Sequence, residues 1–184
     1  YDVALDFNRD GVADRAVLVL EGPGRTDFSD LSNERYALSD DEQIHLAIYF
    51  GGGSAPPDIN KTADVFAPHV LAPERGDWVL VPEATGTGSL RLIHAIGWGS
   101  SNESDETLTL AWREGRAVVA GYTVGWETRN GSGTCDVNLL GGKALLTEGV
   151  DEDGPKTALK GSFKPVPLEQ WSEAARPKVC DTVM

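Results

Sequence analysis

The chain has 184 residues, of which 40% are apolar, so it is too apolar to be wholly disordered and long enough for one domain with its own core. Its 16 Lys and Arg residues face 29 Asp and Glu residues, which gives a formal net charge of −13. This charge argues against binding to nucleic acid or docking on anionic lipid, because both need a cationic surface. No apolar run reaches the length of a membrane span, so we expect no membrane insertion.

The first feature along the chain is an acidic loop at residues 6–14. Side-chain oxygens stand at positions 1, 3, 5 and 9 of this loop, from Asp6, Asn8, Asp10 and Asp14. Calcium needs several hard oxygen ligands around one point, Gly11 permits the sharp turn, and the Val12 carbonyl adds a backbone oxygen. An EF-hand is excluded because its twelfth position would be Val17, not Glu, and because a strand follows.

The acidic loop resembles the calcium loop of FG-GAP and VCBS-type repeats, which occur in secreted proteins and integrin-like propellers. The shared pattern is D-x-[DN]-x-D-G-x-x-D followed by an apolar strand, and it covers roughly residues 4 to 20. The resemblance implies a structural calcium ion held by Asp6, Asn8, Asp10, the Val12 main chain and Asp14. A propeller needs several such blades, and the chain holds one good copy, so we expect no full propeller. The alternative is an Asp/Asn/Gly turn that holds no metal.

Downstream, the apolar pattern predicts a series of short strands. Residues 15–20 form an apolar run typical of a buried strand, and residues 43–50 alternate between apolar and mixed positions. Further strands are expected at 78–81, 90–96, 107–112, 117–126, 137–140, 144–147 and 156–163. The Pro-rich tail 165–184 is expected to form short helical turns, with Leu168 and Trp171 as anchors. We therefore predict a mainly β protein, a single antiparallel domain over 1–184 built as a sandwich or barrel.

The turn at 114–115 predicts a central hairpin whose register the sequence leaves open. A two-residue turn pairs Leu110 with Val119. A three-residue loop instead pairs Leu108 with Tyr122 and Trp112 with Val118. The two registers differ by one position, and that difference exchanges the buried and exposed faces of the strands.

The two cysteines predict one disulfide between Cys135 and Cys180, which would close a segment of 45 residues (180 − 135) and add roughly 4 kcal/mol in the chain-entropy model. The alternative is two buried free thiols in a cytosolic protein. The chain opens at Tyr1 without a charged and apolar leader, which a removed export signal or a trimmed chain explains. Residues 135–143 with the tail 168–180 look like a family of uncharacterised exported bacterial proteins. We therefore expect a periplasmic or secreted protein.

Other groups of residues suggest weaker sites. His45, His69 and His94 lack the spacing of metal ligands, so core or surface positions are expected for them. Four carboxylates gather in and beside the central hairpin, at Glu103, Asp105, Glu106 and Glu127, where they form either a solvated rim or the paired acids of a glycosidase. Trp98 stands between two glycines and is a candidate ligand-binding residue, with core packing as the alternative; Trp112, Tyr122 and Trp126 are expected in the core.

The leading hypothesis is a non-enzymatic, exported, calcium-stabilised binding domain at the cell envelope, a monomer with a protein or glycan partner. The first alternative is a hydrolase of envelope polysaccharide that acts through the carboxylates of residues 103–127. The second is an inhibitor-type binder whose acidic surface meets a cationic protein.

Overall fold

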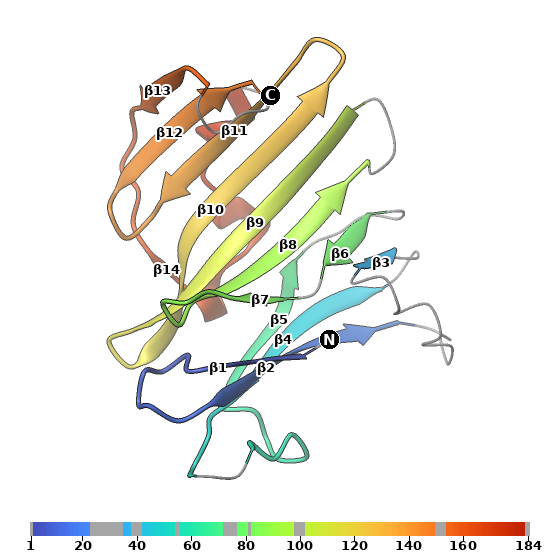
Figure 1. Cartoon of the computed structure of the whole chain (residues 1–184), viewed down its shortest axis with the longest axis vertical. Helices are drawn as coiled ribbons and strands as arrows, with labels where there is room; N and C mark the ends of the chain where they lie inside the picture. The colour runs from blue at the N-terminus through green and yellow to red at the C-terminus, as the bar shows by residue number, and fades with distance from the viewer. Residues whose placement is uncertain are drawn as a thin grey trace.

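The computed structural model describes residues 2–22, 35–37, 42–53, 56–71, 77–80, 82–97, 102–149 and 154–182. Over these residues the protein is mainly β, and its strands pair antiparallel in two sheets that do not close into a barrel (Figure 1). The predicted antiparallel β fold is confirmed. Within the same residues, no helix combines the length and apolar character that crossing a bilayer requires.

The smaller sheet has the strand order β1-β2-β4-β5. Its strands are β1 (Asp2–Leu5), β2 (Asp14–Glu21), β4 (Gln43–Tyr49) and β5 (Val65–Leu71). The predicted strand at residues 43–50 is β4, in which Ile44, Leu46 and Ile48 are fully buried on one face and His45 and Ala47 are buried on the other. Against Ile44 and Leu46, β5 carries an irregularity in register at which His69 adopts a φ of 51°. Strands β1 and β5 were not predicted, because they are short or interrupted by Pro68.

The larger sheet has the order β13-β12-β11-β10-β9-β8-β6-β3, with β14 paired to β10 and β7 paired to β8. Its strands are β3 (Arg35–Ala37), β6 (Trp78–Leu80), β7 (Glu83–Ala84), β8 (Leu90–Ile96), β9 (Asn102–Arg113), β10 (Arg116–Thr128), β11 (Gly131–Asn138), β12 (Lys143–Glu148), β13 (Lys156–Leu159) and β14 (Val166–Pro167). The predicted strand 90–96 is β8. The strand expected at 137–140 instead begins at Gly131 and ends at Asn138, and residues 139–142 form the turn to β12.

The central hairpin combines parts of both predicted registers. A two-residue turn at 114–115 pairs Leu110 with Val119, as in the first register. A bulge between Val119 and Gly121 then inserts one residue, Ala120, so that Leu108 pairs with Tyr122 as in the second. The pair of Trp112 with Val118 does not form, because Trp112 lies opposite Ala117. The Ala120 carbonyl accepts hydrogen bonds from the amides of residues 139 and 140, which ties the bulge to the next turn.

The smaller sheet packs against one face of the larger sheet, and the two share one hydrophobic core. Trp112 joins them, with its ring 6.1 Å from that of Phe7 and 5.1 Å from that of Phe50. The C-terminal tail (red in Figure 1) lies behind the larger sheet, and its first turn contacts both β10 and β5. The tail contains three 3₁₀ turns, η2 (Leu168–Gln170), η3 (Glu173–Ala175) and η4 (Cys180–Thr182).

The predicted disulfide is confirmed. Cys135 of β11 and Cys180 of η4 are bonded, with their Cα atoms 5.7 Å apart, and both are fully buried. The tail is thereby fixed to the inner face of the larger sheet, where Leu168 is also buried. The sequence predicted Leu168 and Trp171 as anchors, and both belong to or pack on the shared core.

Candidate functional site

The acidic loop 6–14 is the turn of the β1–β2 hairpin, because Leu5 pairs with Asp14. Gly11 has a φ of 86°, the left-handed conformation that the sharp turn requires. The loop also reaches the larger sheet, where the Arg9 guanidinium donates to the Thr87 carbonyl at 2.8 Å. The loop therefore lies at one end of the core and touches both sheets.

Asp14 closes this loop from inside the protein. It is fully buried, and one carboxylate oxygen accepts the amides of Phe7 at 2.8 Å and Asn8 at 3.1 Å. The other accepts the amide of Gly51 at 2.9 Å. Three backbone donors therefore compensate the buried negative charge of Asp14.

Asp6 differs from Asp14 in that one of its oxygens is unsatisfied. Its Oδ2 accepts the Gly11 amide at 3.1 Å, whereas its buried Oδ1 has no hydrogen-bond partner. Asn8 and Asp10 fold back on the loop, with their side-chain oxygens accepting the Asp10 and Val12 amides at 3.0 Å and 2.8 Å. A buried carboxylate oxygen without a partner is costly unless a cation or water meets it.

The unpartnered Asp6 Oδ1 makes the loop residues compatible with a bound calcium ion. A carboxylate oxygen that accepts one N–H keeps a second lone pair, and the predicted set adds the Asn8 amide oxygen and the Val12 carbonyl. In the part of the chain that the structure describes, no three His, Cys, Asp or Glu side chains gather closely enough to hold a metal ion by themselves. The calcium site remains a prediction that needs these non-carboxylate oxygens.

The carboxylates of the central hairpin divide between the two faces of the larger sheet. Glu103 pairs with Glu127 and Asp105 with Gly125, so the three acids lie on the outer face. Glu106, the next residue, lies on the inner face with Leu108. Strand alternation explains this division, because Asp105 and Glu106 are neighbours in one strand and point to opposite faces.

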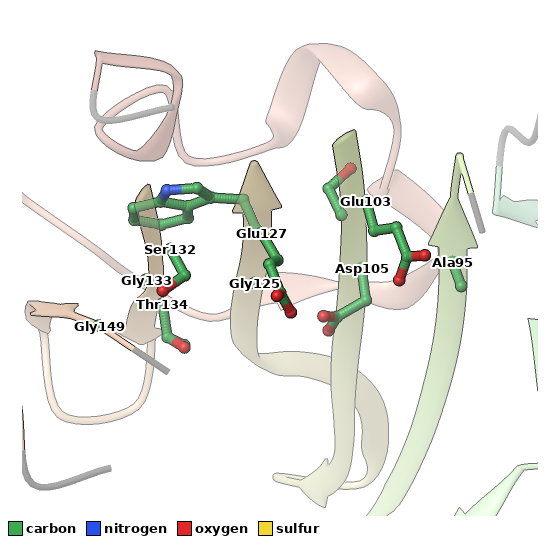
Figure 2. A pocket seen from close by; sticks show the side chains of 11 residues that line it. Ala95, Glu103, Asp105, Gly125, Glu127, Ser132, Gly133, Thr134 and Gly149 are labelled. Atoms are coloured by element: carbon green, nitrogen blue, oxygen red, sulfur yellow. The ribbon is translucent and has the colours of Figure 1, made fainter. Parts of the chain in front are cut away.

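On the outer face, the three acids line a shallow hollow of about 220 Å³ together with Ser132 and Thr134, which we call the outer groove. Figure 2 shows the carboxylates of Glu103, Asp105 and Glu127 turned to the same side of the strands. The Asp105 carboxylate lies over Gly125, where a Cβ would come within 2.4 Å of its Oδ1. Burial, and then the charge of Glu106, raise the pKa of Asp105 above its ordinary value.

The inner face holds a more enclosed space between the two sheets and the tail, which we call the inter-sheet cavity. It has a volume of about 310 Å³. Its walls come from β5 (His69, Val70), from Asp77 just before β6, from the larger sheet (His94, Glu106, Leu108) and from the tail (Trp171, Glu173, Arg176). Both apolar and ionisable side chains line it, as is typical of ligand sites.

Two polar groups of the inter-sheet cavity are held by partners. His94 and Asp77 are both buried, and His94 Nε2 lies 2.9 Å from an Asp77 carboxylate oxygen. Glu106 accepts the Tyr122 hydroxyl at 2.9 Å and also binds Arg176 of the tail. Burial, and then the negative charge of Glu106, raise the pKa of Tyr122 far above its ordinary range.

At the edge of the cavity, the irregularity in β5 brings His69 to His45. The His69 amide donates to His45 Nδ1 at 3.2 Å, while His45 Nε2 lies 3.0 Å from Glu21. His45 therefore carries its proton on Nε2, since Nδ1 must accept. His69 and His94 line one cavity, but within the described ranges the histidines form no metal-binding group.

The other aromatic candidates fall in different places. Trp98 lies outside the described residues. Tyr122 is 1% exposed and packs on Trp171 with ring centroids 6.1 Å apart, while Trp112 and Trp126 pack partly buried against the core, as predicted. The Trp126 indole lies over Gly133, where a Cβ would come within 2.5 Å of Cζ2.

Comparison with models of known protein families, with curated proteins and with solved structures finds no match to this chain. The fold and the site describe a two-sheet antiparallel β protein. Its C-terminal tail is anchored by a disulfide and closes one side of a cavity.

The sequence singled out Glu106, His94 and Trp171 separately, but it did not predict that they line one cavity. Asp77 and Arg176 stood out in no motif, because their partners are distant in sequence. The useful signal was strand alternation, which places Glu106 on the same face as the apolar Leu108 and Leu110. An acid on an apolar strand face indicates a buried partner or a binding site.

Proposed function

We propose that this protein is a binding domain that holds a small ligand in the inter-sheet cavity. The observation that supports the proposal is the cavity itself, about 310 Å³ between two sheets, which is within the size range of small-molecule sites. Its His94–Asp77 and Glu106–Tyr122 pairs hold polar groups in place before any ligand arrives. Such preorganisation lowers the entropic cost of binding. In this proposal the cavity recognises its ligand, and none of its groups has a role in turnover.

The tail makes the disulfide part of this function. Trp171 and Arg176 form one wall of the cavity, and Cys180 fixes the chain that follows them to β11. A structural disulfide favours an oxidising compartment. We therefore propose that the protein works in the periplasm or outside the cell, at the cell envelope.

We further propose that the acidic loop holds one structural calcium ion. The residues that would bind it are Asp6, Asn8, Asp10, the Val12 carbonyl and Asp14, and the unpartnered Asp6 Oδ1 supports the assignment. The ion would supply positive charge beside crowded carboxylates and a fixed centre for the loop. At ~1 mM calcium and a dissociation constant on the order of 0.1 mM, it would stabilise the fold by roughly 1.4 kcal/mol.

A cavity-filling substitution tests the binding proposal. Ile96 lines the cavity at the end of β8, whereas Ile93 of the same strand lies on the opposite face. The wild type is incubated with the small-molecule fraction of a cell-envelope extract and examined by native mass spectrometry. We expect a bound small molecule in the wild type and in Ile93→Trp, and its loss in Ile96→Trp.

Circular dichroism and thermal melting show whether both variants keep the fold. Absence of any retained small molecule from the wild type would contradict the proposal. Equal retention by Ile96→Trp and the wild type would place the ligand elsewhere.

The outer groove supports a second candidate, the carboxylate-dependent hydrolase of envelope polysaccharide. Glu103 and Glu127 stand directly opposite each other on paired strands, and the raised pKa of Asp105 favours its protonated form. Glycosidases need two nearby carboxyl groups, one of them protonated. This candidate concerns a different face from the inter-sheet cavity.

Turnover of peptidoglycan separates the two candidates. A hydrolase would release reducing sugar ends with the wild type, and would lose activity in Glu103→Gln or Glu127→Gln. Glu173→Gln, which changes a residue of the inter-sheet cavity that is not among the causes of the raised pKa of Asp105, serves as the control and would leave hydrolysis unchanged. No release above a buffer blank by the wild type would remove the hydrolase candidate for this substrate.

A further inference from the structure

We propose that the ligand of the inter-sheet cavity is a small organic cation with an apolar body. This inference rests on the proposed function, in which the cavity is the ligand site. It is carried by an indole ring and three acids in the cavity walls, which also hold one guanidinium and the imidazoles of His69 and His94. Asp77, Glu106 and Glu173 supply the carboxylates, Arg176 the guanidinium and Trp171 the indole.

The guanidinium in the walls is already neutralised. Arg176 binds Glu106 directly, and its other terminal nitrogen lies 3.8 Å from Asp181. Asp77 is paired with His94 at 2.9 Å, so among the described wall residues it is Glu173 that adds negative charge beyond these pairs. An anionic ligand would be repelled, whereas a cation would be attracted, and more strongly than in water because the space is partly enclosed.

The indole of Trp171 provides a second kind of contact for a cation. Trp171 lines the cavity and is held against the Tyr122 ring with centroids 6.1 Å apart and planes inclined by 44°. The face of an indole attracts ammonium groups, most strongly when both are shielded from water. Val70 and Leu108 add the apolar surface that methyl or methylene groups would cover.

The size of the cavity limits the class further. A space of about 310 Å³ fits a compact amine or quaternary ammonium compound and excludes a folded polypeptide segment. The net charge of −13 also raises the local concentration of cations near the protein.

Three probes of one shape and different charge test this inference. Choline is the cation, 3,3-dimethylbutan-1-ol its neutral isostere and 3,3-dimethylbutanoate its anionic counterpart. Binding to the full chain is followed by ¹H–¹⁵N NMR, with shifts of the Trp171 indole and of the backbone amides around the cavity as the readout. We expect choline to bind about tenfold more tightly than the neutral isostere, and the anion to bind most weakly.

A matched pair of charge reversals in the tail assigns the effect to the cavity. Glu173 lies in η3 and lines the cavity, whereas Glu169 lies in η2 away from it, and both are exposed. Glu173→Lys should weaken choline binding several-fold, and Glu169→Lys should leave it close to wild type. Because both side chains are exposed, neither change is expected to disturb folding.

The outcomes separate the ligand class from the site. If the neutral or the anionic probe binds as tightly as choline at cavity residues, the cation is wrong while the cavity remains a ligand site. If no probe shifts any cavity residue at up to about 10 mM, well above ordinary affinities, this inference fails. The extract experiment with Ile96→Trp then decides separately whether the cavity binds anything.

Discussion

At the scale of single residues, the acidic loop depends on a glycine distant in sequence. The Gly51 amide donates to Asp14, and a Cβ on Gly51 would lie 2.3 Å from the Ala13 carbonyl oxygen. Gly51→Ala should therefore destabilise the protein by roughly 1–3 kcal/mol, because backbone must move to admit one methyl group. Urea unfolding measures the change. Gly52→Ala is the control, since a Cβ there meets nothing within 4 Å; equal losses in both variants would contradict the packing described here.

Tyr122 makes the stability of the protein depend on alkaline pH. Burial and Glu106 raise the pKa of its phenol above the usual 10.0 in the folded state. Above pH 10 the unfolded chain therefore releases this proton while the folded protein keeps it. The Tyr122 contribution to stability is complete below that pH and declines as pH rises beyond it.

The measurement compares the wild type with Tyr122→Phe. At neutral pH the variant should be less stable by about 1.5–3 kcal/mol, because a hydrogen bond to a charged group is lost. The difference should narrow between pH 10 and 11 in urea unfolding experiments. Tyr49→Phe, which removes a phenol distant from Glu106, controls for loss of a phenol as such. If the difference in unfolding free energy between the wild type and Tyr122→Phe widened with pH, the folded state would lower the pKa of Tyr122 and not raise it.

At the scale of elements, local patterns predicted strands well and non-local partners poorly. Alternation identified β4, and the turn at 114–115 identified the central hairpin. The bulge at Ala120 was not predictable, because it is favoured by hydrogen bonds to the turn 139–142, which a strand pattern does not contain. The same limit explains why the Asp77–His94 pair was missed. Its members meet only once β6 and β8 are aligned.

The tail is an element whose position depends on the disulfide. The double variant Cys135→Ser/Cys180→Ser should lose up to about 4 kcal/mol of stability, since the link closes a 45-residue segment. It should also expose Trp171 to acrylamide quenching, because non-covalent contacts must then hold the tail without the covalent link. Fluorescence quenching and urea unfolding test both effects. Unchanged quenching would show that the tail stays in place without the bond.

At the scale of the whole molecule, composition predicted the class of fold but not where a ligand would bind. The acidic loop was predictable because its residues are adjacent in sequence. The inter-sheet cavity was not, because it is assembled from β5, the larger sheet and the tail. The two features occupy different parts of one core. Calcium at the loop would stabilise the core that shapes the cavity, so the two proposals are coupled through stability and not through shared residues.

The charge of the whole molecule permits a final test of the calcium proposal. With a net charge of −13, the folded protein repels itself, so its melting temperature should rise as NaCl is added. Specific calcium binding must therefore be measured at fixed ionic strength. We expect ~1 mM CaCl₂ to raise the midpoint by a few degrees, excess chelator to reverse the rise, and equal MgCl₂ to do less.

Asp6→Asn should reduce the rise in melting temperature with calcium, whereas Asp136→Asn, on the exposed side of β11, should leave it intact. If calcium and magnesium raised the melting temperature equally, or if Asp6→Asn kept the full rise with calcium, the effect of calcium would be general charge screening and not binding at the loop.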